Sequence, residues 1–244
     1  MGRGFMDIVA WAILVSLIGA ILIYLSRDQP FPEVSRNQGA LLLGLSLMLL
    51  LSSASPRQFD RERVSVTIVT IMGGVQMMYG AWNMSSHRDV IVGPMSGILL
   101  CAGAMALFAD DWNASSKSEQ AVAFITLSLL LLLETYIFFK GMIVGTSAKS
   151  WSAAGLRQTQ RGLLMGNRGA IGCFERAWDM EEGYINAMSH HALNKIYSHL
   201  GEEESSIKHH EKLERLGGKE SVDDAWSEAL DDALNQLNNT KNIV

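Results

Sequence analysis

The chain has 244 residues, 48% of them hydrophobic, with a net charge of −5 and two cysteines. The negative charge argues against nucleic acid as a ligand, and two cysteines are too few for a disulfide framework or a cysteine-based metal site. Five apolar runs lie within residues 1–145, and the rest of the chain contains none. This division predicts an all-α integral membrane protein: an N-terminal bundle of about five transmembrane helices followed by a small soluble module.

The five apolar runs differ in length. A bilayer core about 30 Å thick requires about 20 helical residues, so the second and third runs must recruit flanking residues to cross it. The sequence is therefore compatible with either four or five transmembrane spans. The first run lacks a small-residue cleavage site and is expected to be retained. We expect spans at about residues 8–25, 38–55, 64–82, 90–108 and 121–139.

Loop charges predict the orientation of the chain. With five spans, eight Lys and Arg residues lie on the side of the C-terminus and five, including Arg3, Arg57 and Arg61, on the other side. Since cytoplasmic loops carry the excess of basic residues, the C-terminus is expected to be cytoplasmic. The same holds with four spans. Without a cleavable signal or organelle address, a prokaryotic plasma membrane is the expected location.

Small residues gather in the third and fourth runs. They allow helix backbones to approach closely where water cannot drive association, so these two spans are expected at the centre of the bundle. The residues concerned are Gly73, Gly74, Gly93, Gly97 and Gly103.

Two polar residues, Gln76 and Glu134, fall within predicted spans. An unpaired charge in hydrocarbon is costly, so an intramembrane acid is a functional hypothesis. We expect a structural role, with Glu134 either protonated or hydrogen-bonded to Gln76, Thr135 or Tyr79. The alternative is a small ion-coupled transporter in which Glu134 is the functional acid.

The charge balance changes after the last span. Residues 146–168 carry four basic residues and no acid, whereas residues 169–244 carry seven basic and fifteen acidic residues. Cations next to a span are attracted to anionic lipid. The predicted ligands of lipid headgroups are Lys149, Arg157, Arg161 and Arg168.

Apolar residues beyond 146 recur with a helical period, and glycines separate about five short helices. Residues 155–218 resemble the tetratricopeptide repeat family, whose repeats are helical hairpins of about 34 residues. Residues 221–237 resemble that family's capping helix, so the module spans 155–244. The second-helix pattern of one repeat and the first-helix pattern of the next are matched by Ala170, Phe174, Ala177, Leu193, Tyr197 and Gly201.

The second repeat departs from the family pattern at Asn194, Ser206 and His210. Two repeats are fewer than the three that normally make a stable array. Packing on the membrane or self-association is expected to compensate, so a homo-oligomer and a larger membrane complex both stay open.

The resemblance implies a protein-binding face built from first helices. In the second repeat this face would include Met188, His191, Lys195 and His199. Three of these recur every four residues and form a mostly basic stripe, which could receive an acidic or C-terminal carboxylate peptide. A solvated helix face has the same pattern.

Catalytic and metal-binding signatures are not found in the sequence. The histidine-rich stretch 190–210 lacks cysteine and well-spaced carboxylates, and Asp110 with Asp111 would need a third metal ligand. We therefore expect no cofactor, no metal and no enzymatic activity. The predicted function is a membrane scaffold or complex subunit that presents a protein-interaction module to a cytoplasmic protein partner.

Overall fold

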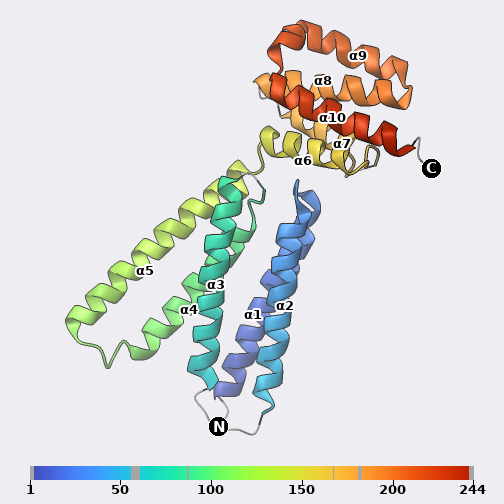
Figure 1. Ribbon diagram of the computed structural model, residues 1–244. Helices are drawn as coiled ribbons and strands as arrows, with labels where there is room; N and C mark the ends of the chain where they lie inside the picture. Colours follow the sequence, from blue (N-terminus) through green and yellow to red (C-terminus); the bar gives the residue numbers. More distant parts are fainter. Residues whose placement is uncertain (1–2, 56–60, 87, 167, 181–182, 242–244) are drawn as a thin grey trace. The chain divides into compact units, whose positions relative to one another are not determined.

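The computed structural model describes residues 3–55, 61–86, 88–166, 168–180 and 183–241 (Figure 1). Arg57, which was counted among the loop charges that predict the orientation, lies outside these residues, as do the side chains of Arg3 and Arg61. The chain divides into two compact units, Met1–Gly145 and Thr146–Val244.

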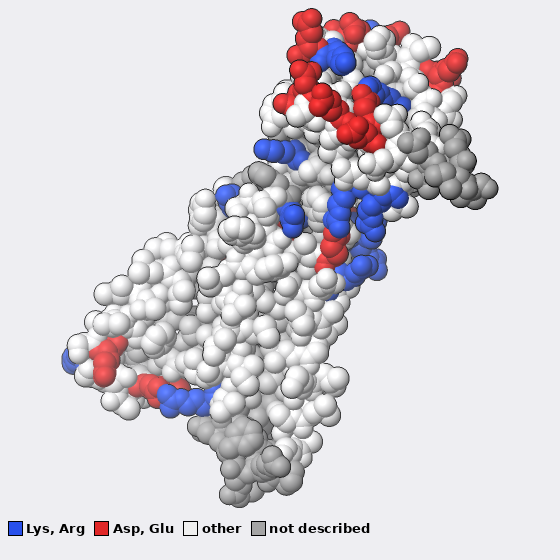
Figure 2. Space-filling view, in the orientation of Figure 1, with Lys and Arg blue, Asp and Glu red and all other residues white. Residues whose placement is uncertain are grey.

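Among the residues that the structure describes, the first unit contains five helices that are long and apolar enough to cross a membrane, which confirms the prediction of about five long apolar helices. No strand occurs in the part of the chain that the structure describes. In Figure 2 its visible surface carries Lys, Arg, Asp and Glu near its two ends and is almost free of them between. The helices are α1 (Arg3–Leu25), α2 (Pro32–Ser53), α3 (Arg61–Ser85), α4 (Val92–Asp111) and α5 (Lys117–Phe138).

The helices of the first unit pack most extensively in two pairs, α1 with α2 and α3 with α4. Glycines form the closest approach in each pair. A Cβ atom at Gly39 would lie 2.6 Å from the carbonyl oxygen of Gly19, and a Cβ atom at Gly80 would collide with the backbone of Gly93. Both pairs therefore depend on the absence of a side chain.

Two of these helices extend beyond their apolar runs. α2 begins at Pro32 rather than at residue 38, and α3 ends at Ser85 rather than at residue 82. The added turns contain buried polar residues, Ser35 and Asn83. A prediction from hydropathy ends a span at such polar residues. In the folded chain they can be buried against a neighbouring helix when they are hydrogen-bonded, so the helix continues.

Buried Asp89 joins the start of α4 to α2. Its Oδ1 atom accepts hydrogen bonds from the backbone N–H groups of Ile91 (2.9 Å) and Val92 (2.8 Å), and its Oδ2 atom accepts one from the Ser35 hydroxyl. The carboxylate thus satisfies orphan donors at a helix start, as an N-cap does.

The end of the last long helix leads to the second unit. α5 begins with a capping box between Ser116 and Glu119, and it continues as a π-helical segment, Phe139–Val144. Gly145 then adopts φ 74°, a conformation that suits glycine. A residue with a side chain would be strained at this position.

In its described residues, the second unit consists of two helical hairpins, α6 with α7 and α8 with α9, and of α10, which contacts α6 and α8. The ring of Phe174 is fully buried in its core and lies over Gly155, where a Cβ would come within 2.7 Å of the ring. The helices are α6 (Ala148–Gln160), α7 (Ala170–Asp179), α8 (Gly183–Leu200), α9 (Glu203–Arg215) and α10 (Asp224–Lys241), with a 3-10 turn at Gly218–Ser221.

Candidate functional site

The predicted partner-binding stripe on α8 does not form an open surface. Met188 and His191 are buried, and His199 is partly buried with no hydrogen-bond partner for its Nε2 atom among the described residues. The expectation that these side chains face a free groove is therefore wrong for Met188 and His191. The resemblance to tetratricopeptide repeats predicted a helix at α8, but it did not predict which element packs on its polar face.

Helix α10 covers this stripe. His191 Nε2 lies 3.0 Å from the Ser227 hydroxyl, and Lys195 Nζ donates to the carboxylate of Asp231, 2.6 Å from its Oδ2 atom. Both pairs join residues separated by 36 positions, so α8 and α10 match each other turn for turn. Polar residues that were expected to bind a partner instead hold α10 in place.

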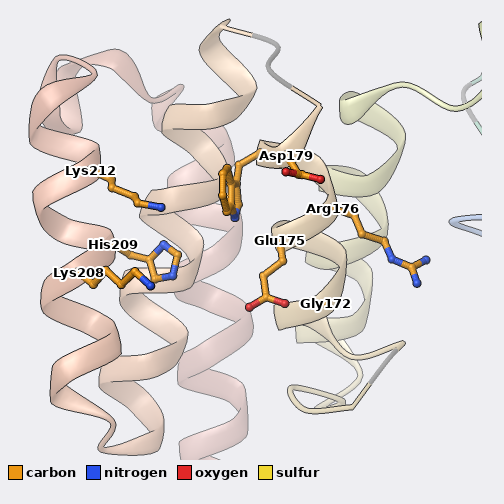
Figure 3. A pocket seen from close by; sticks show the side chains of 8 residues that line it. Gly172, Glu175, Arg176, Asp179, Lys208, His209 and Lys212 are labelled. Carbon is orange, nitrogen blue, oxygen red and sulfur yellow. The ribbon is translucent and has the colours of Figure 1, made fainter.

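An open groove lies elsewhere in the same unit, between α7 and α9 (Figure 3). It is a cavity of about 440 Å³. Figure 3 shows Lys208, His209 and Lys212 on one helix, facing Glu175 and Asp179 on the other. The groove thus has a basic wall and an acidic wall.

The charged side chains of the two walls do not neutralise each other. Lys212 Nζ lies 4.3 Å from the centroid of the Trp178 ring, a cation–π contact. No ion pair between the walls occurs among the described residues. Arg176 also lines the groove, but its guanidinium group extends away from the α9 side chains (Figure 3) and lies 4.7 Å from the centroid of the Trp151 ring. The lysines of α9 are therefore available to a ligand.

His209, which lines the groove, pairs with a second buried histidine, His190. The Nδ1 atoms of His190 and His209 lie 3.0 Å apart, so one imidazole donates to the other. Burial lowers the pKa of each to about 4, and the nearby charge of Lys212 acts on both in the same direction. The Trp178 ring packs against His190 at a tilt of 36°, and the Tyr197 ring stacks on His209. Both histidines are consequently neutral at pH 7.

The histidine-rich stretch does not assemble a metal centre. Within the part of the chain that the structure describes, no three His, Cys, Asp or Glu side chains are arranged to hold a metal ion. His190 and His209 pair with each other, whereas His191 faces α10.

The first unit holds a second candidate site, where α4 meets α3 and α5. Glu134 of α5 is buried over Gly97, at which a Cβ would collide with the carboxylate. Neither of its carboxylate oxygens has a hydrogen-bond partner among the described residues. Ser96 Oγ donates to Gln76 Oε1 at 3.3 Å, and Gln76 Nε2 has no partner there.

Two of the three groups proposed as partners of Glu134, Thr135 and Gln76, form hydrogen bonds with other residues. The Thr135 hydroxyl donates to the backbone carbonyl of Leu131, and Gln76 pairs with Ser96. The structure thus brings Glu134 and Gln76 to the same helix, α4, without joining them. A buried, unpaired carboxyl of this kind is costly as an ion.

The predicted packing glycines differ in their surroundings. A Cβ at Gly73 would come within 2.6 Å of the Leu100 backbone nitrogen, and one at Gly103 would collide with Thr70. Gly74, in contrast, has only an ordinary contact with the Leu100 side chain at 3.5 Å. The predicted headgroup ligands Lys149, Arg157, Arg161 and Arg168 are all exposed.

The groove between α7 and α9 was not predicted. Its signals were Lys208 and Lys212, which lie one turn apart on α9, and Trp178, which is only partly buried. Neither signal identifies a groove until α7 and α9 are known to pack on the same helix, α8, and to line one cavity.

Comparison of the chain with known family models, curated proteins and solved structures found no match. The five long apolar helices are compatible with a membrane protein.

Proposed function

We propose that this chain is a non-enzymatic integral membrane protein that presents a protein-interaction module on the cytoplasmic side of a plasma membrane. The first unit anchors the chain, and the second binds a segment of a partner protein. The observation that carries this proposal is the open, charged groove between α7 and α9.

The hairpin arrangement supports a tetratricopeptide-like module. Ala170, Phe174 and Ala177 are buried on one face of α7, as the family pattern requires of a second helix. α10 packs across the first helices of both hairpins, α6 and α8, and its Ser227 and Asp231 pair with residues of α8. A capping helix in that place closes the usual concave face, which leaves the second-helix groove as the binding surface.

The chemistry of the groove favours a peptide with a carboxylate. Lys208 and Lys212 can donate charge-assisted hydrogen bonds to a C-terminal or acidic side-chain carboxylate. The Trp178 ring offers an apolar contact beside them. The facing Glu175 and Asp179 repel a uniformly acidic chain, so a segment with a single carboxylate near basic or neutral residues fits best.

Photo-crosslinking in cells tests the groove. A photo-reactive amino acid replacing Lys208 should give a discrete crosslinked product, and the same substitution at exposed Lys219, outside the groove, should not. Adding Lys212→Glu should weaken capture by at least about tenfold, because a charge-assisted hydrogen bond is replaced by repulsion. Equal products at positions 208 and 219, or capture unaffected by Lys212→Glu, would exclude the groove.

A second candidate function is ion-coupled transport, favoured by the unpartnered carboxyl of Glu134. An intramembrane carboxyl that can gain or lose a proton is a common element of proton relays. Under the scaffold proposal, by contrast, Glu134 stays neutral and serves only as a packing group over Gly97.

The substitution Glu134→Gln discriminates the two functions. We expect it to retain both folding and crosslinking at position 208, because a neutral amide of similar shape replaces a carboxyl without partners. Proton flux into vesicles containing the purified chain is the second readout, with exposed Asp110→Asn as the matched control. A proton flux of the parent chain that Glu134→Gln abolishes and Asp110→Asn preserves would support transport instead.

A further inference from the structure

The connection between α6 and α7 exposes two large apolar side chains between two arginines. Leu163 is 50% and Met165 65% exposed, and Arg161 and Arg168 are exposed on either side. Leu164, between the apolar pair, is buried in the core of the second unit. The buried residue therefore anchors the loop while its two neighbours point outward.

Backbone hydrogen bonds fix the shape of this loop. The carbonyl oxygen of Leu163 accepts from the N–H of Ala170 at 2.9 Å, and that of Leu164 accepts from the N–H of Ile171 at 3.1 Å. Gly162 and Gly166 adopt φ of 73° and 92°, which allows the tight turns. The exposed apolar pair is consequently held in place before any ligand binds, which lowers the entropic cost of binding.

The outer face of α6 continues the same surface. Lys149, Ala153 and Arg157 recur every four residues and are exposed, whereas Trp151, Ala154 and Thr159 face the core. No acidic residue occurs anywhere in residues 146–168. One side of this helix and the loop after it thus form a basic surface with apolar residues at its tip.

We propose that this surface, which we call the α6 docking face, binds anionic lipid headgroups while Leu163 and Met165 insert at the acyl boundary. Here the α6 docking face comprises Lys149, Arg157, Arg161, Leu163, Met165 and Arg168. The inference rests on the proposal that the first unit spans a bilayer.

Two observations favour lipid over a protein as the occupant. Cations directly after a span are attracted to an anionic leaflet, about fivefold in partitioning for each charge. A pair of apolar side chains flanked by arginines also matches the interfacial pattern, in which apolar groups enter the lipid and basic groups stay at the headgroups. The remainder of the second unit is acidic, so the same leaflet repels its other faces.

The test uses the full chain, reconstituted in vesicles and labelled with an environment-sensitive fluorophore through Met165→Cys. The native cysteines, Cys101 and Cys173, are buried, and a charged, water-soluble reagent restricts labelling to position 165. We expect a blue-shifted emission in vesicles with 30% phosphatidylglycerol and a smaller shift in pure phosphatidylcholine. A label at Ile207→Cys, similarly exposed on α9, should not shift.

Charge removal distinguishes headgroup binding from simple apolar insertion. Arg161→Gln with Arg168→Gln should lower the ratio of docked to undocked module by about 25-fold, and Arg215→Gln with Lys219→Gln, at two exposed positions outside the α6 docking face, should leave it unchanged. No shift at position 165, an equal shift in both kinds of vesicle, or an equal shift at position 207 would overturn the proposal. So would a shift that appears only when a cell extract supplies a protein partner.

The outcome is separable from that of the proposed function. If the first unit does not span a bilayer, the chain will not co-purify with vesicles after an alkaline carbonate wash. If it does and position 165 stays in water, only the docking proposal fails.

Discussion

The substitution Gly80→Leu is expected to separate α3 from α4 and to destabilise the first unit by about 3 kcal/mol. A Cβ atom at this position would collide with the backbone nitrogen and Cα of Gly93. Backbone cannot rotate away as a side chain can, so the helices must move apart, at the upper end of the usual cost of overpacking. The packing that small residues permit between helices would be lost with it.

The accessibility of Cys101 measures this effect. Cys101 is buried on α4, and its labelling by a thiol reagent reports opening of the unit as denaturing detergent is added. We expect Gly80→Leu to lower the midpoint of this transition substantially.

The matched control is Gly44→Leu, since Gly44 lies inside α2 and a Cβ atom there would meet no other atom within 4 Å. Both substitutions gain the same helix propensity, so their difference isolates the contact with Gly93. Equal midpoints for the two variants would contradict close packing of α3 on α4.

The five long helices could be predicted because hydropathy is a local property of the sequence. The ends of α2 and α3 could not, since Ser35 and Asn83 are polar and are buried only through neighbours. Ser35 is bonded to Asp89, which lies far away along the chain. Hydropathy is averaged over neighbouring residues, so a hydrogen-bond partner this far away along the chain does not enter the prediction of where a helix ends.

Glycine packing was predictable in kind but not in position. The adjacent Gly73 and Gly74 were both expected to pack, yet only Gly73 approaches a neighbouring backbone, because adjacent residues lie about 100° apart around a helix. Gly80, where α3 comes closest to the backbone of α4, has no separate signal in the sequence. Which face of a helix meets its partner depends on the rotation of both helices.

In the second unit, the sequence indicated the hairpins but not the place of α10. The stripe of His191 and Lys195 has a complement in Ser227 and Asp231, which also lie one turn apart. In the sequence, the pairing corresponds to two polar residues four positions apart on each helix, with the second pair 36 residues after the first. The pairing was not predicted because polar residues on a helix were expected to face solvent or a partner protein, and not another helix of the same chain.

Acidification from pH 7 to pH 4 should destabilise the second unit by about 3 kcal/mol through His190 and His209. Burial lowers the pKa of both to about 4, from an ordinary value of 6.5. The folded state therefore favours their neutral forms. Stability from this source is complete above pH 6.5, declines as the pH falls towards 4, and is fully lost below it. One such shift of about 2.5 units corresponds to about 3 kcal/mol, and a single shift is counted because the two hydrogen-bonded imidazoles titrate as a coupled pair.

The thiol of Cys173 reports this loss of stability. It is buried in the second unit, and burial raises its pKa to about 11, so it stays unreactive while the unit is folded. Urea midpoints at pH 7, 5.5 and 4 can be followed with dithiodipyridine, which reacts with exposed thiols in acid, using detergent-solubilised chain with Cys101→Ala.

Replacing both buried histidines removes the acid sensitivity if they are its source. His190→Gln with His209→Gln should lower the midpoint at pH 7, since the ring stacking with Trp178 and Tyr197 is lost, but should flatten the decline between pH 6.5 and 4. Exposed His210→Gln is the control and should retain the parent profile. A decline that persists in the double variant would assign the acid sensitivity to the carboxylates instead, whose protonation disrupts contacts such as that between Lys195 and Asp231.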